Sequence, residues 1–82
     1  MRNYQTIYNV KLVRGNDCGV VRVRYYYKEG KFTLYAKMYN QLTGKLIHRS
    51  LNTFTNRRTV TVWAHKFIDS AVNSGAYIAN PF

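Results

Sequence analysis

Acidic residues are scarce in this chain. Only three of its 82 residues are acidic, against thirteen lysines and arginines, and the formal net charge at pH 7 is +10. Charges of the two signs are therefore not interspersed as they are on an ordinary soluble surface. Such a balance predicts attraction to phosphates or other anionic surfaces, and nucleic acid is the partner that it favours. The alternative is a basic protein with no specific anionic partner.

Cysteine is almost absent as well. Cys18 is the only one, which excludes an intramolecular disulfide framework and leaves too few thiols for a thiolate zinc site. The two histidines, His48 and His65, and the three acids are scattered and form no recognisable ligand set. We therefore expect no metal and no other cofactor, and a reducing, intracellular setting.

Long apolar runs are missing too. No stretch approaches the length of a membrane span, and the first residues lack the apolar core of a secretion signal. We expect a cytoplasmic protein with no membrane partner. Without a linker, a repeat or a low-complexity tract, residues 1–82 are expected to form a single domain. A core of this size is only marginally sufficient, so a homodimer or a bound partner would help to stabilise it.

Two segments alternate clearly with the period of a β-strand, residues 19–28 and 31–40, and the Glu29-Gly30 reversal joins them. Each segment has one apolar face, formed by Val21, Val23, Tyr25 and Tyr27 in the first and by Phe32, Leu34, Ala36 and Met38 in the second. The opposite faces carry Arg22, Arg24, Tyr26 and Lys28, and Lys31, Thr33, Tyr35, Lys37 and Tyr39. The agreement of both strands predicts a sheet with one apolar and one basic, aromatic face.

The remaining elements complete an α+β fold. Residues 4–13 and 45–51 are expected to be strands, although their faces are too mixed to assign. The apolar spacing from residue 57 to residue 74 predicts an amphipathic helix, with Thr55 or Asn56 as N-cap and Gly75 just beyond its end. We therefore expect a four-stranded antiparallel sheet with one C-terminal helix on the apolar face. Residues 76–82 stay unassigned.

The basic, aromatic face is the candidate site. Lysine and arginine would neutralise phosphates, and exposed tyrosines would stack on unpaired bases, which favours RNA or single strands over duplex DNA. The alternative is that tyrosine is simply favoured in β-strands and that the charges only keep the sheet soluble. The predicted nucleic-acid-binding residues are Arg22, Arg24, Tyr26, Lys28, Tyr35, Lys37, Tyr39, Lys45, Arg49, Arg57 and Arg58. The last two open the helix, where a bound phosphate would offset their conflict with its dipole.

The segment Gly30–Phe67 resembles the AP2-like, arm-type DNA-binding domain of tyrosine integrases. The resemblance is carried by Gly30-Lys31, by Thr43-Gly44-Lys45 and by Phe54-Thr55-Asn56-Arg57-Arg58, followed by a helix with Val60, Trp63 and Ala64 inward. It implies a sheet that reads DNA through Thr33, Tyr35, Lys37, Lys45, Ile47 and Arg49. Extra strands before Gly30 depart from that pattern, and no recombinase domain follows in this sequence. The resemblance therefore implies an accessory factor of a phage or mobile element.

Two other classes of protein compete with this interpretation. A small ribonuclease would use His48 and His65 as acid and base, but no feature of the sequence brings both to one phosphate. His65 and Asp69, spaced i, i+4, form an ordinary surface contact in most helices. A phage-type inhibitor or antitoxin would use exposed Tyr and Arg to bind a host enzyme, with or without RNA. We expect a non-catalytic nucleic-acid-binding protein, with the inhibitor as the alternative.

Overall fold

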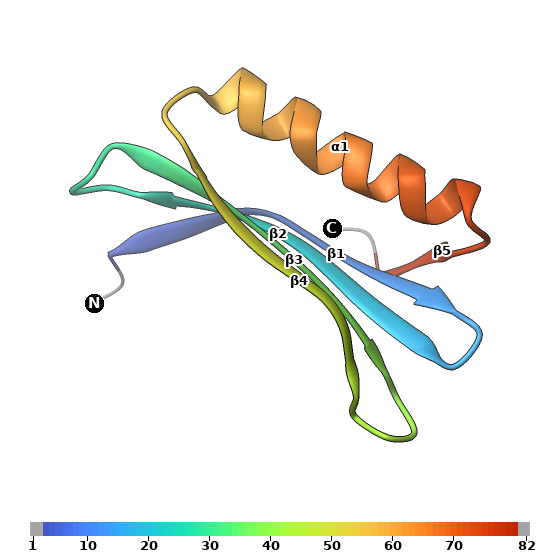
Figure 1. The fold of residues 1–82 in the computed structure, drawn as a ribbon. Helices are drawn as coiled ribbons and strands as arrows, with labels where there is room; N and C mark the ends of the chain where they lie inside the picture. Colours follow the sequence, from blue (N-terminus) through green and yellow to red (C-terminus); the bar gives the residue numbers. More distant parts are fainter. Residues whose placement is uncertain (1–2, 81–82) are drawn as a thin grey trace.

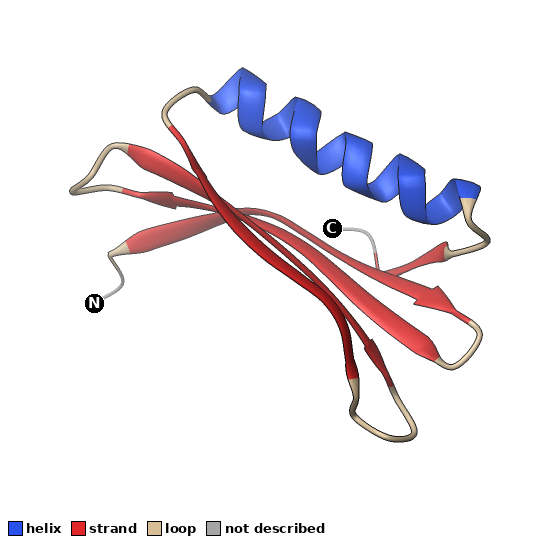
Figure 2. Cartoon of the chain, in the orientation of Figure 1, coloured by secondary structure: helices blue, strands red, loops and turns tan. Residues whose placement is uncertain are grey.

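The computed structural model describes residues 3–80, and it has an α+β architecture with two layers (Figures 1 and 2). One helix crosses one side of an antiparallel sheet, and the opposite side of the sheet has no helix over it. The elements in chain order are β1 (Tyr4–Arg14), β2 (Asp17–Tyr26), β3 (Lys31–Asn40), β4 (Leu46–Phe54), α1 (Arg57–Asn73) and β5 (Tyr77–Asn80). Along the sheet the strands are ordered β4-β3-β2-β1-β5.

Short turns connect the first four strands into a meander. Arg14 pairs with Asp17, so that only Gly15 and Asn16 form the first loop. Gly15 has a φ of 59° and Asn16 does not have a positive φ, which is the pattern of a type II′ turn. This turn suits the twist of the strands and fixes the register of the first hairpin.

The core lies between α1 and one face of the sheet. Buried strand residues at alternate positions meet three buried helix residues; the cluster comprises Val10, Leu12, Val21, Val23, Phe32, Leu34, Val60, Ala64 and Ile68. Leu34 and Val60 have no exposed surface at all. The apolar faces predicted for β2 and β3 are therefore the faces that the helix covers.

The two ends of α1 are set by local chemistry. The Asn56 side chain accepts hydrogen bonds from the backbone N–H groups of Arg58 at 2.8 Å and Thr59 at 3.2 Å, so Asn56 rather than Thr55 is the N-cap. Gly75 follows the helix with a φ of 105°, a conformation that glycine adopts without a Cβ clash. The predicted helix is confirmed to within a residue.

The sheet has five strands, and the prediction of four was wrong. The fifth strand, β5, pairs with Lys11–Val13 of β1, and no strand pattern in residues 77–80 predicts it. β4 extends to Phe54 and does not stop at residue 51, and β2 covers Asp17–Tyr26 and not residues 19–28. Tyr27 and Lys28 consequently lie in the turn before β3, where Tyr27 is exposed.

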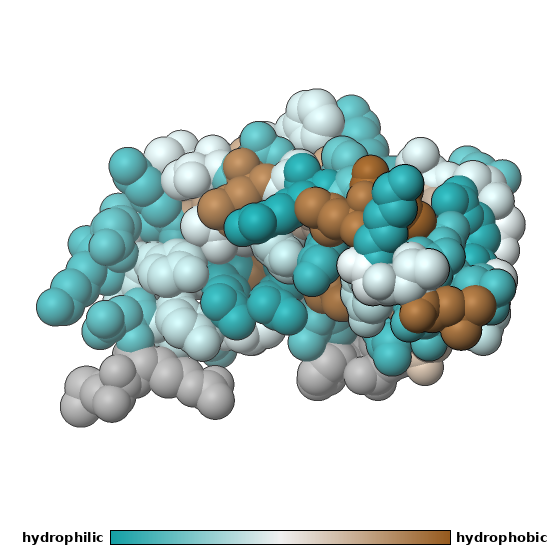
Figure 3. Space-filling view, turned by 60° about the horizontal axis from the view of Figure 1, so that its bottom comes forward, coloured by the Kyte–Doolittle hydropathy of each residue, from teal (hydrophilic) through white to brown (hydrophobic). Residues whose placement is uncertain are grey.

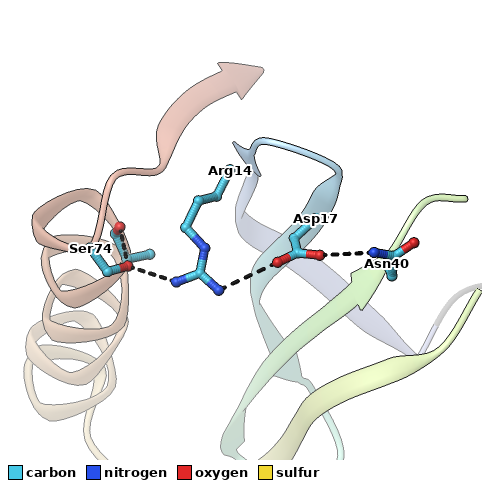
Figure 4. A network of polar contacts seen from close by, with 5 residues as sticks. Arg14, Asp17, Asn40 and Ser74 are labelled. Atoms are coloured by element: carbon cyan, nitrogen blue, oxygen red, sulfur yellow. Dashed lines mark hydrogen bonds and ion pairs between the residues drawn. The ribbon is translucent and has the colours of Figure 1, made fainter.

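A polar network joins the turn between β1 and β2 to the end of the helix (Figure 4). Arg14 donates to Ser74 Oγ at 3.0 Å and to Asp17 Oδ2 at 3.4 Å. Asn40 Nδ2 donates to the other Asp17 oxygen at 3.3 Å. Asp17, one of the three acidic residues, therefore has a structural role in this network. Within residues 3–80, no helix is both long enough and apolar enough to cross a membrane.

Candidate nucleic-acid interface

The strand register brings the predicted basic and aromatic residues of β2 and β3 side by side. Arg22 lies opposite Tyr35, and Val20 lies opposite Lys37. Alternation along both strands then assigns these side chains to the face away from α1. We call this surface, formed by Val20, Arg22, Arg24, Tyr26, Thr33, Tyr35, Lys37, Tyr39 and Leu51, the open face.

The open face is a shallow hollow with a volume of about 470 Å³. From Thr33 to Tyr39 it follows β3 for roughly 20 Å, at about 3.3 Å per residue. In Figure 3 the underside of the sheet comes forward, and its mostly hydrophilic surface is broken by a few apolar patches. The hollow is therefore long enough for several units of a polymer, and it is open along its length.

Each cation of the open face lies against a tyrosine ring. Arg24 Cζ lies 4.4 Å from the centre of the Tyr4 ring, and Arg22 Cζ lies 5.6 Å from the centre of the Tyr35 ring. Lys37 Nζ lies 5.1 Å from the centre of the Tyr39 ring. Contacts of this kind restrict the long side chains before any ligand binds, which lowers the entropy lost on binding.

The three acidic residues are not paired with these cations. Asp17 lies on the helix side of β2 and is held by Arg14 and Asn40. Asp69 is an exposed residue of α1. Glu29 lies in the turn at one end of the sheet, where it borders the open face in a recess shared with Tyr26 and Thr33. In the part of the chain that the structure describes, no ion pair is formed by a cation of the open face. Its positive charge is therefore available to an external anion.

The predicted residues do not all gather on this surface. Arg22, Arg24, Tyr26, Tyr35, Lys37 and Tyr39 line the hollow. Arg49 pairs with Lys37 across β3 and β4 and extends the same face toward the sheet edge. Lys28 and Lys45 lie in the turns at opposite ends of β3, not on strands.

Arg57 and Arg58 lie apart from the open face. Both are exposed in the first turn of α1, on the other side of the sheet. Arg57 lines a separate recess with Ile7, Tyr8 and Ala64. A ligand in the hollow would not reach these two arginines, so they are not part of the same surface.

Tyr4 is a residue of this region that the sequence did not reveal. A two-residue turn alone would pair Tyr4 with Tyr27, on the helix side. A β-bulge between Thr6 and Tyr8 shifts the register, so Tyr4 pairs with Tyr26 instead, and the two ring centres are 5.5 Å apart. The bulge thereby supplies the ring on which Arg24 stacks, and simple alternation along residues 4–13 could not show it.

The groups proposed for catalysis are separated. His65 lies beside Tyr8 of β1, with ring centres 5.8 Å apart, whereas His48 on β4 lies 6.3 Å from Phe67. These contacts are on opposite flanks of α1. Cys18 is buried. Within residues 3–80, no three His, Cys, Asp or Glu side chains gather where they would hold a metal ion.

Comparisons with protein-family profiles, with curated proteins and with solved structures return no match for this chain.

Proposed function

We propose that this protein binds nucleic acid without catalysis, and that single-stranded RNA or DNA occupies the open face. The observation that carries the proposal is the hollow that Arg22, Arg24 and Lys37 line together with Tyr26, Tyr35 and Tyr39. Phosphates need cations and bases need flat rings, and this surface offers both within one strand spacing.

An ordinary solvated sheet face would differ in two respects. Its cations would be mixed with acids, because interspersed charges of both signs suffice for solubility. Its long side chains would also have no need of fixed positions. Here the cations are unpaired with acids and stacked on rings, which supports a binding surface over a merely soluble one.

Tyrosine rings favour a ligand with unpaired bases. Bases in a duplex are stacked on one another and cannot lie against a protein ring, whereas single-stranded bases can. Tyr26, Tyr35 and Tyr39 are each partly exposed, so ring surface is left for a base even while cations lie against Tyr35 and Tyr39. This feature supports RNA or single-stranded DNA over duplex DNA.

The resemblance of Gly30–Phe67 to arm-type domains suggests duplex DNA as the competing ligand. That segment covers β3, β4 and α1 as far as Phe67, a sheet portion with the helix on its far side. Val60 and Ala64 lie in the core as expected, but Trp63 is 45% exposed, and the expectation that it faces inward was wrong. An accessory role in a phage or mobile element, and a cytoplasmic location, remain part of the proposal.

Binding of labelled oligonucleotides tests the proposal. Fluorescence anisotropy with single-stranded RNA, single-stranded DNA and duplex DNA of one length would be followed over a range of salt concentrations. If about five phosphates are engaged, the log–log salt slope on single strands should be near −3.5, from about −0.7 per phosphate. If none of the three oligonucleotides binds at low salt, the proposal is overturned. Tighter binding of the duplex would overturn the stacking part alone.

A further inference from the structure

The outer edge of β4 is a second surface with unused binding groups. In the described chain β4 pairs only with β3, so one side of its backbone has no strand beside it. His48–Phe54 pair with Phe32–Met38 without interruption, and the only irregularity lies between His48 and Leu46. Every second residue of this seven-residue stretch therefore points its N–H and C=O groups outward, in a regular row with no strand beside it.

The other exposed edges of this sheet are protected. β5 is only four residues long, and the free half of β1 is interrupted by the bulge between Thr6 and Tyr8. Short edges and bulges are the usual devices that prevent unwanted strand pairing. The segment His48–Phe54 has neither device and no proline. Its regularity is therefore typical of an edge that receives a strand.

Apolar side chains flank this edge. Leu46, Ile47 and Leu51 are 49%, 50% and 62% exposed, and Leu51 also lines the open face. On the helix side, Trp63 is 45% exposed and lies one turn before Phe67, whose ring is near His48. A strand added to β4 would lie beside Arg49 and Leu51 on one face and meet the Trp63 side of α1 with the other.

The positive charge around β4 favours an acidic partner at this edge. Lys45 precedes the strand, Arg49 lies within it, and Lys66 lies 5.0 Å from the Trp63 ring centre. The strand itself contains no acid. At 100° per residue, Asp69 projects from the outer side of α1 and not toward β4. A second copy paired through this edge would bring like charges together, whereas an acidic segment would complement them.

We propose that β4 accepts an extended acidic segment of a partner protein as a sixth strand. Main-chain hydrogen bonds along His48–Phe54 hold the segment, and alternate side chains select it. Acidic side chains lie on the side of Arg49, and apolar ones lie on the helix side, near Trp63. This surface is separate from most of the open face, and the proposal does not depend on nucleic-acid binding.

A designed peptide probes this edge directly. The probe is a capped peptide of about eight residues that alternates glutamate and valine, and its control replaces every glutamate with lysine. Backbone amide NMR of the full chain should show shifts along residues 48–54, and the emission of Trp63, the only tryptophan, should change. The lysine peptide should bind at least about tenfold more weakly, because its charges oppose those of Arg49 and the nearby Lys45.

Backbone methylation distinguishes strand addition from other binding. Two further peptides carry N-methyl groups on alternate amides, one on the odd and one on the even positions. An added strand donates from one edge only, so one of the two peptides should lose binding and the other should retain it. Equal behaviour of both would contradict the proposal.

Matched variants locate the charge effect. Arg49→Ser should weaken the glutamate peptide severalfold, whereas Asn73→Glu, which gives the same net charge from the exposed end of α1, should not. The proposal is overturned if no shift appears along 48–54 up to about 1 mM peptide, a concentration that detects even weak binding. Shifts confined to Arg22, Tyr35 and Lys37, or a dimer that already pairs β4 with β4, would overturn it equally.

Discussion

Arg22 and Tyr35 lie opposite one another on β2 and β3, and the Arg22 guanidinium carbon lies 5.6 Å from the centre of the Tyr35 ring. The pair couples a phosphate-binding group to a base-stacking group within one hydrogen-bonded strand pair. Lys37 and Tyr39, two residues apart on β3, form a second contact between a cation and a ring. Because the sheet backbone fixes these pairs, the fold and the proposed function can be tested separately.

Loss of two cations should weaken binding without unfolding the protein. The double variant Arg22→Ala and Arg24→Ala should lose affinity for RNA and DNA alike, and its single-strand salt slope should become shallower by about 1.4, from about 0.7 per phosphate. Anisotropy titrations at several salt concentrations measure both effects. The control, Val62→Glu with Asn73→Glu, has the same net charge but alters only exposed helix positions. If the two doubles bind equally, overall charge and not the open face governs affinity.

The Tyr35 ring should matter most for unpaired bases. Tyr35→Ala should weaken single-strand binding by roughly 1–3 kcal/mol, the usual value of one base–aromatic stack, and duplex binding by less. Tyr35→Phe keeps the ring and should behave like the wild type. Titrations with single-stranded and duplex forms of one sequence measure the difference. Equal losses on both forms would contradict stacking.

Stability should depend on the helix-facing side of the sheet and not on the open face. Leu34 is completely buried, so Leu34→Ala should lower the free energy of unfolding by about 2–5 kcal/mol. Leu51 is 62% exposed, so Leu51→Ala should change it by no more than about 0.5 kcal/mol. Urea unfolding followed by circular dichroism measures both. A large loss from Leu51→Ala would mean that the open face is covered.

The Asn56 cap should contribute measurably to the helix. Asn56→Ala removes the acceptor for the N–H groups of Arg58 and Thr59, and should lower the free energy of unfolding by about 1 kcal/mol. Its neighbour Thr55 is exposed and is not the cap, so Thr55→Ala should stay within about 0.5 kcal/mol of the wild type. A reversed order in urea unfolding would assign the cap to Thr55.

The parts of the fold that the sequence predicted are those governed by local periodicity. Alternation in β2 and β3 correctly divided Val21 and Leu34 from Arg22 and Tyr35, because both strands lie in the interior of the sheet with one face buried. The 3.6-residue apolar spacing likewise predicted α1, because one face of this helix is buried against the sheet. Residues 28 and 45 were misplaced by a residue or two, since turns and strand ends differ little in local composition.

Features that depend on distant contacts could not be predicted. β5 has four residues and depends on its pairing with Lys11–Val13. Local sequence patterns do not indicate this distant contact. The bulge that brings Tyr4 to Arg24 inserts one residue into β1, and alternation alone cannot locate it. β4 has mixed faces because it is an edge strand exposed on both sides, so its burial had no clear pattern to detect.

Mapping a bound oligonucleotide by NMR tests the central claim most directly. A short oligouridylate titrated into the labelled protein at low salt should shift the signals of Arg22, Arg24, Tyr35, Lys37 and Tyr39, and leave the outer face of α1, including Val62 and Asn73, unchanged. Shifts centred on α1, or no shifts at saturating oligonucleotide, would contradict the account.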